Sequence, residues 1–485
     1  MMNRMTGGAQ GWQVDPTNIS VADYAGFYER TRRDALFAFS LPQTDGSVIL
    51  GRDHLGNVPL FYRSNAKGVQ ASPLFAEVLS AHDTISPEGV RAYLATGSAK
   101  ILPLTNEVHS VPPGTVLRVF PDGRTETLYE YRFAPRTLQG RSFASLVDEA
   151  DTLLTQAARR TLKEKEVGLY LSGGIDSALS ALALRTAGAV VHAYTATPWG
   201  QESEEARLAS LNAKAVGAAS HEMVPLATDS YDAYAAHPVD AYGNPCGAVS
   251  QMAIRCILEG TKIKEERQVY FAQNCDTMNA SVPDQSLLYF MRNVPGLLRQ
   301  GLHPSLGRST LADELTHFRS VNLVDAFPFP LRAKGYTREA ELAVAGMLFA
   351  HTPVDGDIVI LPSLSQGQIV ANLFYDMDVV EFALGIPLMH RLTTSPESRI
   401  AIALGKRVFK ELARRHLPPD IVDRKKGLTV PTGRDEKTKA FFDALPREAF
   451  GVALSLPTHR FAAEMLARWS ADTPTAPEGL RNLSL

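Results

Sequence analysis

The feature that most constrains the fold is an alternation of short apolar runs with helical patterns between residues 167 and 274. The apolar runs are VGLYLS, VVHAYTA, EMVPL and QVYFAQN, with the helical segments SALSALALRTAG and SEEARLASLNAKAVG between the first three. Parallel strands need a crossover of a dozen or more residues, which is usually a helix. The alternation therefore predicts an α/β domain built on a parallel sheet.

Residues 1–135 show a different pattern, typical of short β-strands. The strand segments are ALFAFSLPQ, SVILGRD, PLFYRS and GTVLRVFPDGRTETLYEYRF. Asp122-Gly123 lies between two extended runs of the last segment and predicts a hairpin. Ser86 followed by Pro87 predicts the start of a short helix. The polar stretch 136–143 indicates a boundary, so we expect one domain over residues 1–142 and a second over 143–485.

Helical patterns frame the second domain. A long amphipathic helix is expected over 143–165, with an apolar stripe at Leu146, Ala150, Leu153, Leu154 and Ala157. The C-terminal third is mostly helical in pattern, including residues 379–387, 399–418 and 461–470.

Composition excludes several classes of protein. The 485 residues contain 49 Lys and Arg against 52 Asp and Glu, a net charge of −3, which argues against nucleic-acid and anionic-membrane partners. Three cysteines, Cys246, Cys256 and Cys275, are too few for a disulfide framework or a Cys-rich zinc cluster. No signal segment and no apolar run long enough to span a bilayer is visible, so a cytoplasmic protein is expected.

The strongest motif is Leu171-Ser172-Gly173-Gly174-Ile175-Asp176-Ser177, directly after the first apolar run and before a helical pattern. Two glycines let the backbone turn tightly, and N–H groups at a helix start favour an anion such as phosphate. Ser172 and Ser177 can donate hydrogen bonds to phosphate oxygens. A carboxylate at Asp176 fits an anion site if a cation bridges the carboxylate and the phosphate. Mg²⁺ prefers carboxylate and phosphate oxygens as ligands. The spacing differs from the GxxxxGK[ST] loop and matches the SGGxDS loop of ATP-pyrophosphatases; the alternative is a plain Ser-Gly turn.

Several segments together resemble class B asparagine synthetases and their relatives, the β-lactam synthetases, carbapenam synthetases and lasso-peptide cyclases. The segment LYLSGGIDSALSA is similar to the synthetase domain of that family, and GRDHLGNVPLFY (51–62) is similar to its RDRxGxxPLYY segment. Val111-Pro112-Pro113-Gly114 resembles its LPPG turn, and DMDVVEFAL (376–384) and LPPDIVDRKKGLTV (417–430) follow its order and spacing.

The resemblance implies a fold and a chemistry. The fold is an N-terminal Ntn-hydrolase-like α/β/β/α sandwich, followed by an α/β ATP-pyrophosphatase domain (adenine nucleotide alpha hydrolase-like) with a helical C-terminal part. The chemistry is adenylation of a carboxylate by ATP with Mg²⁺, followed by attack of an amine that releases AMP. The residues implied to bind the nucleotide are Leu171, Ser172, Gly173, Gly174, Asp176, Ser177 and Tyr194. Asp176 and Asp276 are implied to bind Mg²⁺, and Lys425, with Lys426 as its rival, to stabilise the adenylate.

Two departures from the family pattern stand out. The glutaminase of that family needs an N-terminal cysteine, whereas this chain starts Met1-Met2-Asn3 and has no cysteine before Cys246. The family motif GxGxDxxxGG is reduced to residues 272–279, AQNCDTMN. Gln273 stands where the relatives have Glu or a catalytic Tyr, and a glutamine is not a general base.

These observations favour an ATP-dependent, AMP-forming amide ligase that closes a ring within its substrate, either a lasso-type macrolactam or a β-lactam. The substrate is a small-molecule or peptide carboxylate with an internal amine, and the peptide version implies a precursor peptide and a leader peptidase as partners. Three alternatives stay open. They are an ammonia-dependent asparagine synthetase, a non-catalytic ATP-binding scaffold, and a tRNA-modifying ATP-pyrophosphatase, against which the net charge and the lack of a CxxC pair argue.

Overall fold

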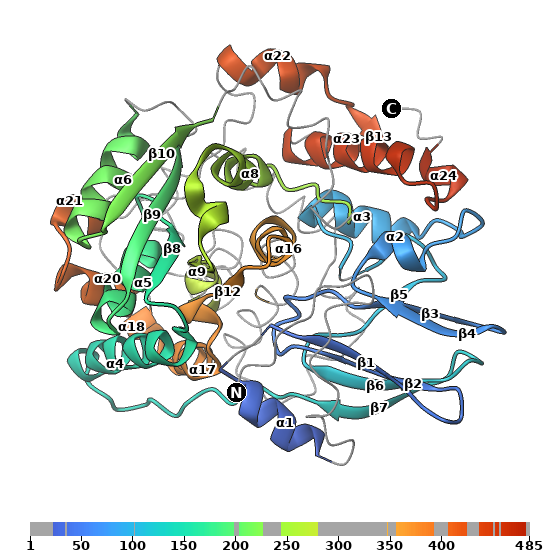
Figure 1. Ribbon diagram of the computed structural model, residues 1–485, viewed down its shortest axis with the longest axis horizontal. Helices are drawn as coiled ribbons and strands as arrows, with labels where there is room; N and C mark the ends of the chain where they lie inside the picture. Colours follow the sequence, from blue (N-terminus) through green and yellow to red (C-terminus); the bar gives the residue numbers. More distant parts are fainter. Residues whose placement is uncertain are drawn as a thin grey trace, which may run out of the picture.

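The computed structural model describes residues 23–33, 36–100, 102–197, 203–226, 244–279, 347, 356–391, 406–423, 436–449, 452–454 and 457–481. Within these ranges the chain forms a five-stranded parallel sheet, two smaller antiparallel sheets, a short two-stranded ribbon, and the helices that cover them (Figure 1).

The parallel sheet confirms the α/β prediction. Its strand order is β10-β9-β8-β11-β12, and every printed pairing is parallel. The strands are β8 (Glu166–Tyr170), β9 (Val190–Thr197), β10 (Ser220–Pro225), β11 (Gln268–Tyr270) and β12 (Ile369–Ala371). The first strand of the alternating region, β8, lies in the centre, so the loop that follows it opens at the middle of the sheet edge.

Helices cover the parallel sheet on both sides. They are α4 (Phe143–Thr161), α5 (Ile175–Thr186), α6 (Glu204–Ala215) and α8 (Gln251–Gly260). Figure 1 shows α6 and α8 on opposite sides of β9 and β10. The side chain of Ser142 accepts a hydrogen bond from the Ser145 N–H and caps α4, and the predicted apolar stripe of that helix is buried.

The N-terminal part is a four-layered arrangement of helices and antiparallel sheets. The sheets are β1-β2-β6-β7 and β4-β3-β5. The elements are α1 (Tyr24–Thr31), β1 (Ala38–Pro42), β2 (Val48–Arg52), β3 (Phe61–Asn65), β4 (Gly68–Ser72), α2 (Phe75–Val78), α3 (Pro87–Thr96), β5 (His109–Ser110), β6 (Thr115–Val119) and β7 (Thr125–Glu130).

Alternate side chains of these strands enter different cores, which defines the layers. Leu50 of β2 joins the cluster between the two sheets, whereas its neighbour Ile49 packs on the side of α1. Phe61 of β3 points the other way and packs with α2 and α3. The order is therefore α1, sheet, sheet, α2 with α3, as Figure 1 shows. The predicted hairpin is present, with Gly123 at φ +87°, and the Ser86 side chain caps α3 by accepting from the Gly89 N–H at 3.1 Å.

The remaining elements lie in the C-terminal half. They are η3 (Lys262–Glu265), α9 (Cys275–Met278), η6 (Gly356–Ile360), α16 (Leu361–Ser365), η7 (Leu373–Tyr375), α17 (Met377–Gly385), α18 (Leu388–Arg391), α20 (Arg407–Arg414), α21 (Pro419–Val422), α22 (Glu436–Ala444), β13 (Glu448–Ala449), β14 (Val452–Ala453), α23 (Pro457–Asp472) and α24 (Glu478–Arg481). No helix among the described residues is long and apolar enough to cross a membrane.

The helical pattern expected over residues 399–418 is confirmed from Arg407 to Arg414. Helix α20 begins at Arg407, because Lys406 has a left-handed backbone with φ +58° and interrupts the helical path. Residues 399–405 of that prediction lie outside the described ranges. The expected strand QVYFAQN is also shorter, because β11 ends at Tyr270 and the chain turns toward α9.

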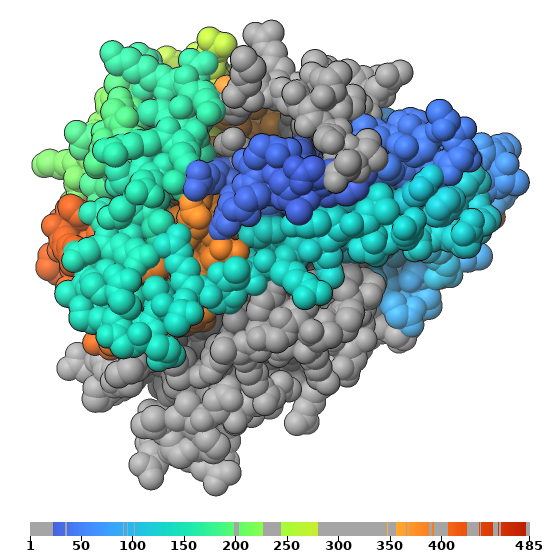
Figure 2. All heavy atoms as spheres, turned by 90° about the horizontal axis from the view of Figure 1, so that it is seen from below, coloured from blue at the N-terminus to red at the C-terminus, as the bar shows by residue number. Residues whose placement is uncertain are grey.

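The parts of the chain on either side of residue 142 share one junction. The Glu381 carboxylate of α17 accepts hydrogen bonds from Arg32 at 2.6 Å, from the Tyr131 hydroxyl at 2.8 Å and from the Ala134 N–H at 2.8 Å. Figure 2 shows this side of the molecule, with α17 between α1 and α4. One apolar cluster runs through both parts. The proposed boundary at residues 142 and 143 thus lies at the cap of α4, within a continuous core, and stays a prediction.

A buried histidine gives the N-terminal part a pH-dependent stability. His54 is buried and its Nε2 donates to the Tyr28 carbonyl oxygen at 2.9 Å, with the ring between Tyr28 and Tyr131. Burial lowers the pKa of His54 to about 3. The unfolded chain binds a proton at His54 below about pH 6.5 and the folded chain does not, so this group removes stability as the pH falls from 6.5 toward 3.

We therefore expect the free energy of unfolding to fall less between pH 7 and pH 5 in His54→Gln than in the wild type, by about 2 kcal/mol. The glutamine amide can still donate to the Tyr28 carbonyl. Urea unfolding at the two pH values measures the difference, with the exposed His82→Gln as the control. Equal pH dependence in the wild type and in His54→Gln would contradict the assignment.

Candidate functional site

The SGGIDS loop lies where the sequence predicts it, between the end of β8 and the start of α5. Residues 171–174 form the turn, and Gly174 is the N-cap of α5. The Leu171 N–H donates to the Tyr194 carbonyl at 2.9 Å, and the Thr195 hydroxyl donates to the Leu171 carbonyl at 2.6 Å. The loop is thus attached to β9 and opens at the carboxyl edge of the sheet, the edge where open α/β sheets bind ligands.

Two serines shape the loop from inside. The Ser172 N–H donates to Ser177 Oγ at 3.1 Å, and the Gly174 N–H donates to Ser172 Oγ at 3.1 Å. The two hydroxyl oxygens lie 3.1 Å apart. These bonds form a small cradle at the start of α5, a helix of 12 residues whose N-terminus favours an anion. The structure brings together the predicted loop residues Leu171, Ser172, Gly173, Gly174, Asp176 and Ser177.

Asn212 braces the loop from α6, and the sequence analysis missed it. Its Nδ2 donates to the Ser172 carbonyl at 2.8 Å and to the Gly174 carbonyl at 2.9 Å. Asn212 is fully buried on the same face of α6 as Leu208 and Ala209. A polar residue on the apolar face of a helix was the available signal, because buried amides need partners.

Lys406 is the second residue that the sequence analysis missed. Its Nζ lies 2.5 Å from Asp176 Oδ2 and 2.7 Å from Asp276 Oδ1. Lys406 immediately precedes α20. In the sequence it lies within the helical pattern expected over 399–418, so nothing distinguished it from the other residues of that pattern. The ammonium group contacts both of the carboxylates that the family resemblance implies for Mg²⁺, so the two side chains lie close together, and their role in metal binding stays a prediction.

The three charges shift one another. Burial opposes the charged form of Lys406, but the carboxylates of Asp176 and Asp276 outweigh burial and raise the pKa of Lys406 above its usual value. Burial raises the pKa of Asp176, and the Lys406 ammonium acts in the opposite direction. The side chains of Lys406 and Asp176 are 10% and 17% exposed, whereas that of Asp276 is 43% exposed. Solvent therefore reaches the site mainly at the Asp276 carboxylate.

The residues fit a divalent cation. Asp176 Oδ1 is buried without a hydrogen-bond partner among the described residues other than the neighbouring Cys275 thiol, so a carboxylate oxygen lies beside the SGGIDS loop where a hard cation could bind. Asp276 lies close enough to share an ammonium group with Asp176. No group of three or more His, Cys, Asp or Glu side chains gathers among the described residues, so phosphate oxygens and water would complete the coordination, as is usual for Mg²⁺. Bound there, Mg²⁺ would neutralise charge on the phosphates.

The other predicted residues are placed as follows. The Tyr194 hydroxyl donates to Glu266 Oε1 at 2.6 Å, and its carbonyl accepts from Leu171, so the ring is engaged beside η3 and its nucleotide contact stays a prediction. Lys425 and Lys426 lie outside the described residues. Gln273 directly precedes the loop residue Asn274, and its carbonyl accepts from Asn372.

A comparison with family models finds one match on part of the chain. Residues 149–267 and 374–480 match the asparagine synthase family model. The match supports an asparagine synthetase-like synthetase domain on this part of the chain, and it includes the loop, Asn212 and Lys406 but not Asp276. None of the curated proteins matches the chain.

An asparagine synthase domain indicates an ATP-dependent enzyme that forms carbon–nitrogen bonds and releases AMP. The family generally uses ATP with Mg²⁺.

Asn212→Ala is expected to weaken MgATP binding about thirtyfold, because it removes two hydrogen bonds to loop carbonyls that each contribute about 1 kcal/mol to the order of the loop. Calorimetric titration with MgATP measures the effect. Ser210→Ala on the same helix is the matched control, since Ser210 Oγ donates to the Ala206 carbonyl within α6 and the hydroxyl is not part of the brace. An unchanged affinity in Asn212→Ala would show that the brace does not order the loop.

Proposed function

We propose that this protein adenylates a substrate carboxylate with ATP and Mg²⁺ and then closes an amide bond within the same substrate, as in a lasso-peptide macrolactam or a β-lactam of natural-product biosynthesis. The observation that carries the proposal is the braced loop at 171–177 with Asp176, Asp276 and Lys406 beside it. An anion cradle next to two carboxylates and a cation suits a triphosphate bound with a metal ion.

The reaction has two balanced steps. In the first, a carboxylate oxygen of the substrate attacks the α-phosphorus of ATP, and the bond to the β-phosphate bridging oxygen breaks to release pyrophosphate. In the second, an amine nitrogen attacks the acyl carbon, the carbon–oxygen bond to AMP breaks with its electron pair on AMP, and the amine loses a proton to a base. The N-terminal end of α5 and Lys406 stabilise the charge that builds on pyrophosphate.

Lys425, with Lys426 as its neighbour, is proposed to stabilise the adenylate and the oxyanion of the second step. A cation at that position would offset negative charge on the acyl oxygen and on the phosphate. Both residues belong to a segment that the family model matches.

Two features favour closure within one substrate over transfer of ammonia from glutamine. Residues 1–245 contain no cysteine, so the layered N-terminal part, which we propose to be an Ntn-hydrolase-like fold, lacks a thiol nucleophile. An amine on the same molecule also reaches the adenylate at a high effective concentration. A high effective concentration lowers the rate acceleration that a general base must supply, and this chain has Gln273 at the position where the relatives have Glu or Tyr. If the substrate is a peptide, a precursor peptide and its leader peptidase are the implied partners.

ATP–pyrophosphate exchange tests adenylation. With a panel of carboxylates and precursor peptides, we expect one substrate to trigger exchange, and we expect Asp176→Asn to lower its rate by at least about a hundredfold because the metal–phosphate link is lost. Lys425→Ala should lower the rate of amide formation more than exchange. Asp472→Asn, at the exposed end of α23, is the matched control. Normal ATP binding with no AMP or pyrophosphate from any substrate would refute the enzyme and favour the scaffold alternative.

The mass of the product distinguishes ring closure from the alternative of an ammonia-dependent asparagine synthetase. The match to the asparagine synthase family model is compatible with that alternative. Ring closure lowers the mass of the substrate by one water and needs no ammonium. An asparagine synthetase would convert aspartate and ammonium to asparagine, with nitrogen-15 label from ammonium in the product. We expect loss of water without label, and labelled asparagine would overturn the closure proposal.

A further inference from the structure

Asn274 has an unusual backbone directly before the segment that carries Asp276. Its φ is +79°, and within the described ranges Asn274 and Lys406 are the two residues other than glycine with positive φ. Asn274 precedes α9, and Lys406 precedes α20. A Cβ disfavours this conformation, asparagine tolerates it best after glycine, and such residues gather at functional sites. The two unusual residues meet at one point, since Lys406 contacts Asp276, two residues after Asn274.

The Asn274 side chain fastens its loop to a second segment. Asn274 is buried, and its Nδ2 donates to the Phe374 carbonyl of η7 at 2.9 Å. A second amide, that of Asn372, makes two hydrogen bonds nearby. Asn372 Nδ2 donates to the Gln273 carbonyl at 3.2 Å, and Asn372 Oδ1 accepts from the Phe374 N–H at 2.9 Å. Two amides thus join residues 273–274 to residues 372–374, a link that we call the amide clasp.

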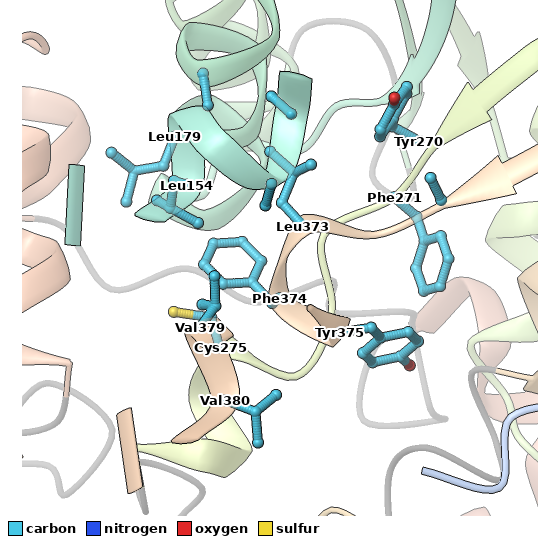
Figure 3. Packing of buried hydrophobic residues seen from close by; sticks show 14 of the residues in the cluster. Leu154, Leu179, Tyr270, Phe271, Cys275, Leu373, Phe374, Tyr375, Val379 and Val380 are labelled. Carbon is cyan, nitrogen blue, oxygen red and sulfur yellow. The ribbon is translucent and has the colours of Figure 1, made fainter. Parts of the chain in front are cut away.

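Both sides of the clasp rest on a rigid core. Figure 3 shows Leu373, Phe374 and Tyr375 of η7 among buried residues with Cys275. The Phe374 ring contacts the Phe409 ring of α20 at a centroid distance of 5.9 Å, and the Tyr375 ring contacts Phe271 at 5.5 Å. Phe374 therefore holds the Asp276 loop through its carbonyl and contacts the Lys406 helix through its ring.

The far end of η7 is anchored as well. Asp376 caps α17 by accepting from the Asp378 N–H at 2.9 Å. Arg160 of α4 donates to Asp376 Oδ2 from Nε at 3.1 Å and also from Nη2. The η7 turn therefore has a fixed place between α4 and α20, and the amide clasp transmits that position to residues 273–276.

We propose that Asn274 is a positioning residue for the metal–nucleotide site, because its left-handed backbone and its amide bond to the Phe374 carbonyl hold Asp276 opposite Asp176 and Lys406. This inference rests on the proposed function, since it assumes that the site binds a metal with a nucleotide. In the family pattern GxGxDxxxGG a glycine stands where this chain has Asn274. Asparagine keeps the positive φ and adds a hydrogen-bond donor that glycine lacks.

The test measures metal binding directly. The probe is Mn²⁺ with α,β-methylene-ATP, whose α–β link cannot be cleaved, and electron paramagnetic resonance of the full chain reports the half-saturating Mn²⁺ concentration. Asn274→Ala loses both the backbone preference and the Asn274 half of the clasp, so we expect that concentration to rise about tenfold. Asn274→Gly keeps the positive φ and loses only the Asn274 half of the clasp, so we expect a rise of about two- to threefold. The order alanine, glycine, wild type is the signature of positioning.

Asn244→Ala is the matched control. Asn244 is also buried, and its amide also bonds to backbone, accepting from the Phe75 N–H at 2.7 Å and donating to the Pro73 carbonyl at 3.1 Å. We expect it to lower the melting temperature without changing the Mn²⁺ requirement. The proposal is overturned if Asn274→Ala binds Mn²⁺ as the wild type does, or if Asn244→Ala shifts the requirement equally. If Asn274→Ala does not fold, Asn274→Gly decides alone, and a wild-type requirement in that variant overturns the role of the clasp.

The same measurement separates this inference from the proposed function. One outcome is that the Mn²⁺ requirement follows the order alanine, glycine, wild type, while the wild type never exchanges pyrophosphate. This outcome would refute the ligase and leave Asn274 as a positioning residue. A wild type that binds no metal–nucleotide would overturn both.

Discussion

Three segments that are far apart in the chain meet at the ammonium group of Lys406. Asp176 comes from the loop after the central strand, Asp276 from the turn after β11, and Lys406 from the start of α20. Two carboxylates held this close repel each other, and the buried ammonium removes that repulsion. Removing it would leave two facing anions, one of them mostly buried. The geometry of the site, and the approach of α20 to the phosphate loop, depend on this pair of contacts.

The rest of the molecule holds those three segments in register. Asn212 fixes the phosphate loop from α6, and the amide clasp fixes the Asp276 turn from η7. Arg160 connects η7 to α4, and Glu381 connects α17 to the N-terminal part. The N-terminal layers therefore contribute to the site through packing and hydrogen bonds. A core shared between the two parts would be costly to disrupt.

The parallel sheet, the position of the phosphate loop, the hairpin at Asp122-Gly123 and the cap at Ser86 were all predictable from sequence. Each of these features is local, because it depends on the period of apolar residues or on a turn residue with a known preference. Asn212 and Lys406 were not predictable with the same rules. Lys406 lies within a helical pattern, and its left-handed backbone is stabilised by carboxylates 230 and 130 residues away in the chain, as its numbering against Asp176 and Asp276 shows.

The sequence by itself determined that this chain has an α/β domain with a Ser-Gly loop between the first strand of that domain and the helix that follows, because hydrophobic period and glycine placement act over a few residues. It also determined that residues 1–245 carry no thiol. Only the tertiary structure decided that Asp176 and Asp276 both contact Lys406. The same is true of the hydrogen bonds by which Asn274 and Asn372 join residues 273–274 to residues 372–374. Such contacts join residues distant in the chain, so their geometry is set by the packing of whole helices and strands and has no local signature.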